Sequence, residues 1–186
     1  MNVSIIADRY AKALFDLAWE KKCIEKVYDD IRFIAQAIKE TRTLKLFFRA
    51  PLINPGKKKA VMRNVFGSTC DPLTLSFLDF LISKRRDDLI PEIAQQFISQ
   101  YKENKNILTV YLRTPLKVDE LIRKSVVSIM QHHTGSTIEL VEEADPSLIG
   151  GFVISWKDYQ YDASIRRQLE RLQRGVARVN LFVKGF

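Results

Sequence analysis

The chain has 186 residues, of which 46% are hydrophobic and 28% are charged, proportions typical of a globular protein with a packed core. No apolar run approaches the roughly 20 residues that span a bilayer. The N-terminus lacks the charged and apolar regions of a signal peptide, so we expect the protein to stay in the compartment where it is made. Thirty basic and 22 acidic residues give a net charge of +8, which permits an acidic protein, a nucleic acid or an anionic membrane surface as partner.

Apolar residues recur every three or four positions through the first hundred residues, which predicts a series of helices. Six are expected, and their apolar positions lie within residues 6–17, 24–38, 44–48, 61–65, 75–82 and 93–101. Asn54-Pro55 and Asp71-Pro72 each combine a capping residue with a proline suited to the first helical position. Six helices with short connections predict a helical bundle over residues 1–105.

The periodicity changes near residues 104–106. Leu108, Val110 and Leu112 alternate with polar side chains, as in a strand, and Gly135 ends a helical pattern that follows. Further alternation occupies residues 137–141, 152–156 and 159–161, and Ser164 can cap a last helix. The predicted fold is therefore mostly α: a six-helix N-terminal bundle followed by a small α+β domain over residues 106–186.

No motif of a catalytic or cofactor site is found. The seven glycines form neither of the phosphate-binding patterns GxxxxGK[ST] and GxGxxG. The adjacent His132 and His133 would point about 100° apart on a helix and so cannot chelate a metal like an i, i+4 pair. Cys23 and Cys70 are far apart in the chain and are expected to be reduced thiols. We therefore expect a non-catalytic protein with no cofactor and no metal.

Basic residues are grouped in three places. The runs Lys57–Lys59 and Lys84–Arg86 are typical of solvated helix ends. The last helix carries a basic stripe at spacings of four, three and four: Arg167, Arg171, Arg174 and Arg178. This stripe is either a solvated face or a contact for an acidic partner helix. Recognised RNA- and DNA-binding motifs are absent, but a basic nucleic-acid-binding protein is the alternative to a protein-binding adaptor.

Three segments are more distinctive. The sequence RYAKALFDLA (residues 9–18) contains small residues that permit either close approach of a partner helix or ordinary packing within the bundle. Residues 77–82 are apolar over more than one stripe, as in a buried helix or the wall of a groove. The sequence DPSLIGG (residues 145–151) predicts a turn whose paired glycines allow close backbone approach, so this motif is expected to build the fold.

Together these segments resemble the delta subunit family of F-type ATP synthases, which includes the mitochondrial oligomycin-sensitivity-conferring protein. Order and spacing hold over nearly the whole chain. The matching segments are RYAKALF (9–15), PLI (51–53), FLDFL (77–81), KRR (84–86), LIP (89–91), DPSLIGG (145–151) and DASI (162–165). Residues 176–186 are the least family-like part, and no role is assigned to them.

The resemblance implies a non-catalytic subunit of the peripheral stalk, or stator, in one copy per complex. It would link the catalytic head to the membrane-anchored b subunits during proton-driven ATP synthesis. Its expected location is the cytoplasmic face of a bacterial membrane, which it would contact only through the complex. Nucleic acid is not an expected partner.

The resemblance also implies two binding sites. The N-terminal domain would bind the amphipathic N-terminal helix of the alpha subunit in a groove between the first and fifth helices. The residues expected to line this groove are Tyr10, Ala13, Leu14, Leu17, Phe77, Phe80 and Leu81. The C-terminal domain would contact the C-terminal end of the b subunit, with the basic stripe of the last helix as the candidate surface.

Overall fold

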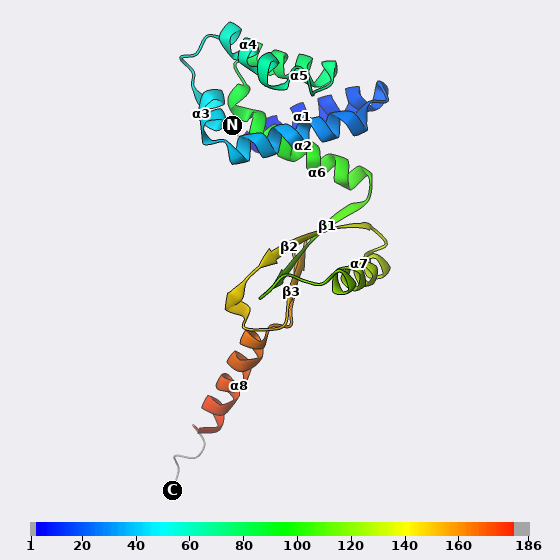
Figure 1. Ribbon diagram of the computed structural model, residues 1–186, viewed down its shortest axis with the longest axis vertical. Coiled ribbons are helices and arrows are strands. Elements are labelled where there is room, and N and C mark those ends of the chain that lie inside the picture. Colours follow the sequence, from blue (N-terminus) through cyan, green and yellow to red (C-terminus); the bar gives the residue numbers. More distant parts are fainter. Residues whose placement is uncertain (1–2, 181–186) are drawn as a thin grey trace. The chain divides into compact units, whose positions relative to one another are not determined.

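Two compact units make up the chain, Met1–Lys105 and Asn106–Phe186. The computed structural model describes residues 3–180, and the side chains of residues 4–173 (Figure 1). The boundary between the units lies where the sequence changes from helical to alternating periodicity. Within residues 3–180, no helix combines the length and the apolar character that a membrane span requires.

The N-terminal unit contains the six predicted helices. They are α1 (Val3–Glu20), α2 (Ile24–Glu40), α3 (Arg42–Arg49), α4 (Pro55–Phe66), α5 (Pro72–Ser83) and α6 (Ile90–Asn104), with a 3₁₀ turn η1 (Asp87–Leu89) before α6. The two predicted helix starts are confirmed. The carboxamide oxygen of Asn54 accepts from the Gly56 N–H at 2.8 Å, and the Asp71 carboxylate accepts from the Leu73 N–H at 2.8 Å. These bonds satisfy N–H groups that have no partner within the helix.

The core of this unit is built around α1, α2 and α6. On α1, the buried stripe consists of Ala7, Ala11, Leu14 and Ala18, each with no exposed surface. These positions follow the i, i+4, i+7 spacing of one helical face, and three alanines on that face allow α1 to pack closely against α6. The buried Phe97 of α6 and the half-buried Phe15 of α1 lie with their ring centroids 6.2 Å apart.

Lys58 contradicts the expectation that the run Lys57–Lys59 is solvated. Its side chain is buried, forms an ion pair with the buried Asp87, and donates to the Phe48 carbonyl at 3.1 Å. The ammonium also lies 6.0 Å from the Phe47 ring centroid. The expectation was wrong for Lys58 because a run of like charges does not show which member faces inward, where a carboxylate and a carbonyl compensate its charge.

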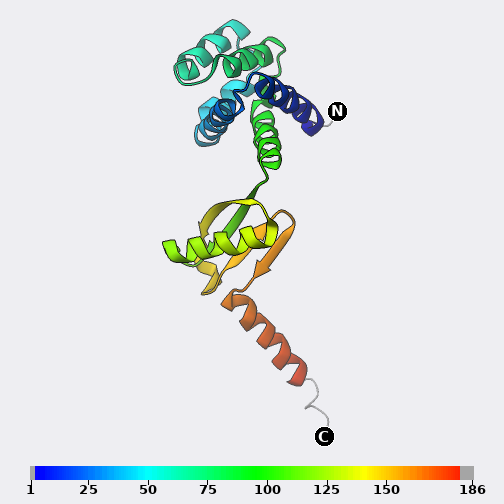
Figure 2. The same cartoon turned by 90° about the vertical axis from the view of Figure 1, so that its right-hand side faces the viewer.

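The C-terminal unit has the predicted α+β fold. Its elements are β1 (Ile107–Thr114), α7 (Glu120–Thr134), β2 (Thr137–Ala144), a 3₁₀ turn η2 (Pro146–Leu148), β3 (Val153–Trp156), β4 (Tyr159–Asp162) and α8 (Ile165–Asn180). The sheet has the order β2-β1-β3-β4, in which β1 and β2 are parallel and the other pairs are antiparallel. Because parallel neighbours need a crossover, α7 connects β1 to β2. Figure 2 shows α7 lying over one face of the sheet, where Met130 packs against Leu108 and Val110.

The DPSLIGG segment holds the start of α8 against the sheet, as predicted for a structural motif. A Cβ atom on Gly150 would lie 2.4 Å from Cδ1 of Ile165, and one on Gly151 would lie 2.3 Å from the Ala163 carbonyl oxygen. Gly151 also has a φ of +76°, which L side chains rarely adopt. The predicted cap of α8 is present, since the Ser164 hydroxyl accepts from the Arg167 N–H at 3.2 Å.

Candidate functional site

The first candidate surface lies on α1 and α5. We give the name α1/α5 surface to five residues that lie outside the buried core: Tyr10, Ala13 and Leu17 of α1 and Phe77 and Phe80 of α5. Tyr10 and Phe77 are half-buried. Ala13 is exposed, Leu17 is 43% exposed and Phe80 is 44% exposed. The rings of Tyr10 and Phe80 meet edge to face, with centroids 6.3 Å apart. This ring pair is the contact that joins the apolar side chains of the two helices on this surface.

Two residues expected on this surface lie elsewhere. Leu14 and Leu81 have no exposed surface and belong to the core. On α1, Leu14 follows the buried alanines at spacings of three and four, whereas Ala13 lies one residue, or about 100°, away on the outer side. Because α5 is apolar on several sides, its sequence did not show which leucine or phenylalanine faces outward.

Polar groups border the α1/α5 surface. The ammonium of Lys84 lies 5.8 Å from the Phe80 ring centroid. Arg9 and Lys12 of α1 are exposed. An apolar centre with a polar border is the usual organisation of a protein-binding surface.

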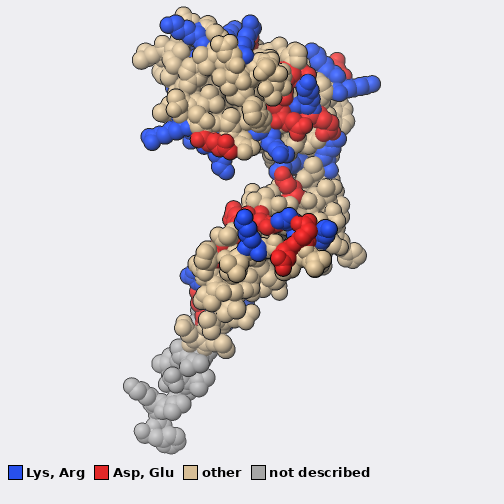
Figure 3. Space-filling model, in the orientation of Figure 1, with Lys and Arg blue, Asp and Glu red and all other residues tan. Residues whose placement is uncertain are grey.

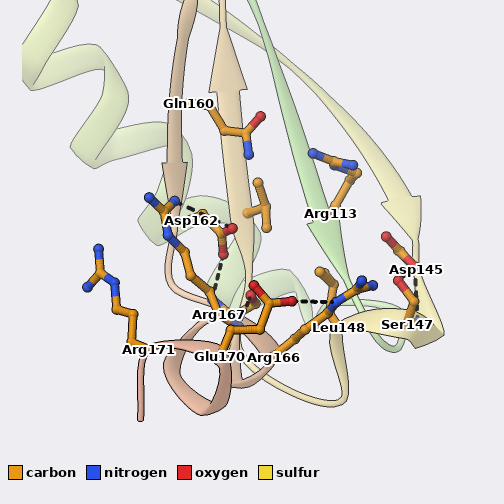
Figure 4. Close-up of a pocket in the computed structure, with 12 residues that line it drawn as sticks. Arg113, Asp145, Ser147, Leu148, Gln160, Asp162, Arg166, Arg167, Glu170 and Arg171 are labelled. Atoms are coloured by element: carbon orange, nitrogen blue, oxygen red, sulfur yellow. Dashed lines mark hydrogen bonds and ion pairs between the residues drawn. The ribbon is translucent and has the colours of Figure 1, made fainter. Parts of the chain in front are cut away.

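The second candidate surface is a basic cleft at the start of α8, with a volume of about 600 Å³. Arg166, Arg167 and Arg171 of α8 and Arg113 of β1 line it (Figure 4). Arg166 pairs with Glu170 at 3.3 Å and Arg167 pairs with Asp162 at 3.5 Å. Neither Arg113 nor Arg171 forms an ion pair within the part of the chain that the structure describes.

Two carboxylates in this cleft are fixed by local hydrogen bonds. The hydroxyl and the N–H of Ser147 donate to Asp145 at 2.6 and 3.0 Å and hold the pKa of Asp145 below its ordinary value. Hydrogen bonds from Ser164 lower the pKa of Asp162 in the same way. Both carboxyl groups are therefore ionised at neutral pH, and the Asp145 carboxylate offsets part of the positive charge of Arg113 and Arg166.

The basic stripe predicted for the last helix is described in part. Arg167 and Arg171 line the cleft, whereas the side chains of Arg174 and Arg178 lie outside those that the structure describes. Sequence reasoning missed Arg166 and Arg113. Arg166 lies in the first turn of the correctly predicted helix, but the approach of Arg113 depends on the pairing of β1 with β3, for which the sequence carries no local signal.

A third opening, with a volume of about 620 Å³, lies between α7 and the β3–β4 hairpin. We call it the hairpin groove. Its lining is mainly aromatic and aliphatic and includes Ile129, Phe152, Trp156, Tyr159 and Tyr161. The periodicity placed several of these residues on strands but did not identify the groove, because α7 leaves this part of the sheet face uncovered.

Comparison with known families identifies the chain. The sequence model of the family described as ATP synthase delta (OSCP) subunit matches residues 6–176. The chain belongs to this family. ATP synthase subunit delta of Chloroherpeton thalassium is 31% identical over 176 residues, covering 95% of this chain and 96% of the relative. The corresponding subunit of a Geobacillus species is 34% identical over 177 residues, covering 94% and 98% of the two chains.

A solved structure shares the fold. One chain of the Toxoplasma gondii mitochondrial ATP synthase hexamer, determined by cryo-EM, superposes with a TM-score of 0.72 at 25% identity and covers 92% of this chain and 97% of its own. The resemblance to the delta (OSCP) family inferred from the sequence is thus confirmed. The family-like segments RYAKALF and FLDFL supply every residue of the α1/α5 surface except Leu17, and DPSLIGG supplies part of the lining of the basic cleft.

Proposed function

We propose that this chain is a non-catalytic stator subunit of an F-type ATP synthase, which links the catalytic head to the membrane-anchored b subunits. The α1/α5 surface is the observation on which the proposal depends, because it offers a site for an amphipathic helix on a domain of the delta (OSCP) family. A second unit with its own basic cleft and hairpin groove supports a two-ended linker. A rotary enzyme needs such a link because the head would otherwise turn with the rotor.

The N-terminal unit would bind the N-terminal helix of the alpha subunit on the α1/α5 surface. Ala13 lies between Tyr10 and Leu17 and leaves room for the backbone of a guest helix. Leu17 and Phe80 are each a little under half exposed, so both retain apolar area that a guest can cover. A nanomolar complex requires about 12 kcal/mol, which an interface of roughly 1,600 Å² supplies when its apolar anchors pack well.

The C-terminal unit would bind the C-terminal end of the b subunit. Arg113 and Arg171 can pair with carboxylates of that segment, and the hairpin groove can receive its apolar side chains. In this arrangement one copy of the chain lies at the cytoplasmic face of a bacterial membrane. It reaches the membrane only through the complex.

The structure gives less support to a nucleic-acid-binding role. In the view of Figure 3, the Lys and Arg side chains of the N-terminal unit are scattered around a wide uncharged area and do not form one basic field. In the basic cleft, Asp145, Asp162 and Glu170 lie among the arginines. Single-stranded nucleic acid is bound by cations interleaved with aromatic stacking platforms, and the lining of this cleft contains no aromatic side chain.

A dissociation experiment on membranes tests the proposal. Inverted membrane vesicles from cells that lack this chain should lose the catalytic head on washing at low ionic strength, and the purified full chain should restore head binding and ATP-driven proton pumping. Hydrolysis of ATP by the released head should persist, because the chain supplies no catalytic residue. Retention of a coupled head without the chain would refute the stator assignment.

A further inference from the structure

The N-terminal unit has a second groove that shares no residue with the α1/α5 surface. It lies between α2 and α6, is bordered at one end by Lys45 of α3, and has a volume of about 420 Å³. Its apolar lining consists of Ala35, Ile38, Pro91 and Ile98. Ile38 is buried, whereas the other three keep part of their surface open to solvent. We call this opening the α2/α6 groove.

The two walls of the groove run alongside one another in opposite directions. Tyr28 near the start of α2 stacks on Tyr101 near the end of α6, with ring centroids 3.8 Å apart, while Lys39 near the end of α2 and Pro91 near the start of α6 both line the groove. On the α2 wall, Arg32, Gln36 and Lys39 are spaced i, i+4, i+7, as are Pro91, Gln95 and Ile98 on the α6 wall. Seven helical residues rise about 10 Å, so each wall extends for about two turns.

The charges of the groove have one sign. Its charged lining residues are Arg32, Lys39 and Lys45, and all three are exposed. Within the described residues, none of them forms an ion pair. The carboxylates of α2 nearest in sequence to Arg32 and Lys39 are those of Asp29, Asp30 and Glu40, none of which lines the groove, and Glu40 accepts from the Gln36 amide at 2.8 Å. The α6 wall contributes only neutral side chains, so the groove is cationic along one edge and neutral along the other.

We propose that the α2/α6 groove binds an acidic amphipathic helix of another protein. The guest would place a narrow apolar stripe over Ala35, Ile38 and Ile98. Carboxylates on one flank, about two turns apart, would pair with Arg32 and Lys39. Its opposite flank would be uncharged, because it faces Gln95 and Pro91. A helix fits better than an extended segment, since both walls repeat at the helical spacing over the same two turns.

The lining of the groove suits an acidic helix better than a nucleic acid. Backbone phosphates would be met by cations along one edge only, and the lining contains no aromatic side chain on which a base could stack. The proposal does not depend on the stator assignment. It predicts a second docking helix on a unit whose α1/α5 surface can be occupied at the same time.

Site-specific photo-cross-linking tests the proposal. Gln36, which is exposed in the middle of the α2 wall, is replaced by p-benzoylphenylalanine in the full-length chain. The chain is produced in its own cells, irradiated there, and the adducts are sequenced by mass spectrometry. We expect one main adduct on an amphipathic segment that carries acidic residues seven apart along one flank. No protein adduct, an adduct on a segment without that acidic flank, or an adduct mainly with RNA would overturn the proposal.

Charge-reversal variants give the test a quantitative control. Arg32→Glu/Lys39→Glu should reduce the yield of this adduct by roughly tenfold or more, because two attractive contacts become repulsive. Lys21→Glu/Lys26→Glu changes the net charge equally at exposed positions outside the groove and should leave the yield unchanged. Circular dichroism must show both variants folded. Equal yields from the two double variants would contradict the pairing of the guest with Arg32 and Lys39.

Discussion

Tyr10 of α1 and Phe80 of α5 contact each other edge to face, with 6.3 Å between their ring centroids, yet Phe80 stays 44% exposed. The contact therefore leaves much of the Phe80 ring uncovered. Leu14 and Leu81 lie below it in the core. The two helices thus contact each other through these rings, while Ala13, Leu17 and Phe80 keep surface open to solvent.

The first prediction concerns Ala13. Ala13→Asp should weaken binding of a synthetic alpha-subunit N-terminal helix from the same organism by about a hundredfold or more, because a carboxylate would be buried without a partner. Since Ala13 is exposed in the free chain, the free energy of unfolding should change by no more than about 0.5 kcal/mol. Titration calorimetry with the full chain measures the affinity.

The matched control for this prediction is Ala60→Asp, at an exposed alanine of α4 outside the α1/α5 surface. It should leave the affinity unchanged. If Ala13→Asp and Ala60→Asp bind the peptide equally well, the α1/α5 surface is not the site.

The second prediction concerns the buried pair of Lys58 and Asp87. Lys58→Met should lower the free energy of unfolding of the N-terminal unit by about 3–5 kcal/mol, because it leaves the Asp87 carboxylate buried without a counter-charge. Urea unfolding followed by Trp19 fluorescence, in a Trp156→Phe background, reports on this unit alone. The chain has two tryptophans, and the other one lies in the C-terminal unit.

A double variant separates the pair from the packing around it. Lys58→Met/Asp87→Leu removes both charges and should be more stable than Lys58→Met alone, although it lacks one more native polar group. Were the double variant the less stable of the two, the loss in Lys58→Met would come from packing and from the lost bond to the Phe48 carbonyl, not from an unpaired charge.

The fold was predictable because its signals are local. Proline with a capping residue marks the starts of α4 and α5, and alternation marks the strands. Gly150 and Gly151 were correctly assigned to the fold, since a side chain at either position would collide with Ile165 or Ala163. The pairing of β1 with β3 was not predictable, because it joins residues about 40 positions apart through contacts that no single segment encodes.

The binding surfaces were predictable only to the level of the helix. The family-like segments pointed to α1 and α5, but the separation of outer residues from core residues depends on tertiary packing, which sets α1 against α6 and α5 against α2 and α4. Ala13 and Leu14 are neighbours in sequence and lie on different sides of that boundary. The hairpin groove and the α2/α6 groove were missed because each is formed by elements whose approach is set by the tertiary fold.

The third prediction concerns the pH dependence of the C-terminal unit. Hydrogen bonds from Ser147 hold the pKa of Asp145 below its ordinary value of 3.8. A carboxyl group whose pKa is lower in the folded than in the unfolded chain stabilises the fold at pH values above its unfolded-state pKa. This stabilisation is lost as the pH falls through the folded-state pKa. Asp145→Asn keeps an acceptor but not the charge. It should therefore be less stable than the wild type at pH 7, and the difference should shrink below pH 3.8.

Thermal unfolding followed by Trp156 fluorescence, in a Trp19→Phe background, measures this difference across the pH range. Asp158→Asn serves as the control, because Asp158 is exposed in the β3–β4 turn. It should unfold like the wild type at every pH. A stability gap for Asp145→Asn that persists unchanged into acid would show that the carboxylate charge is not its source.

The fourth prediction concerns the basic cleft. If Arg113 and Arg171 pair with carboxylates of the b subunit, Arg113→Glu/Arg171→Glu should raise the dissociation constant for its C-terminal segment by about tenfold or more near 0.15 M salt. The wild-type affinity should fall as salt increases, because exposed charges are screened beyond about 8 Å at that ionic strength.

Lys117→Glu/Lys124→Glu makes the same change in net charge at exposed positions outside the cleft and should bind normally. Equal weakening by both double variants would indicate a general effect of net charge, whereas a loss confined to the cleft variant assigns the stalk contact to the arginines at the start of α8.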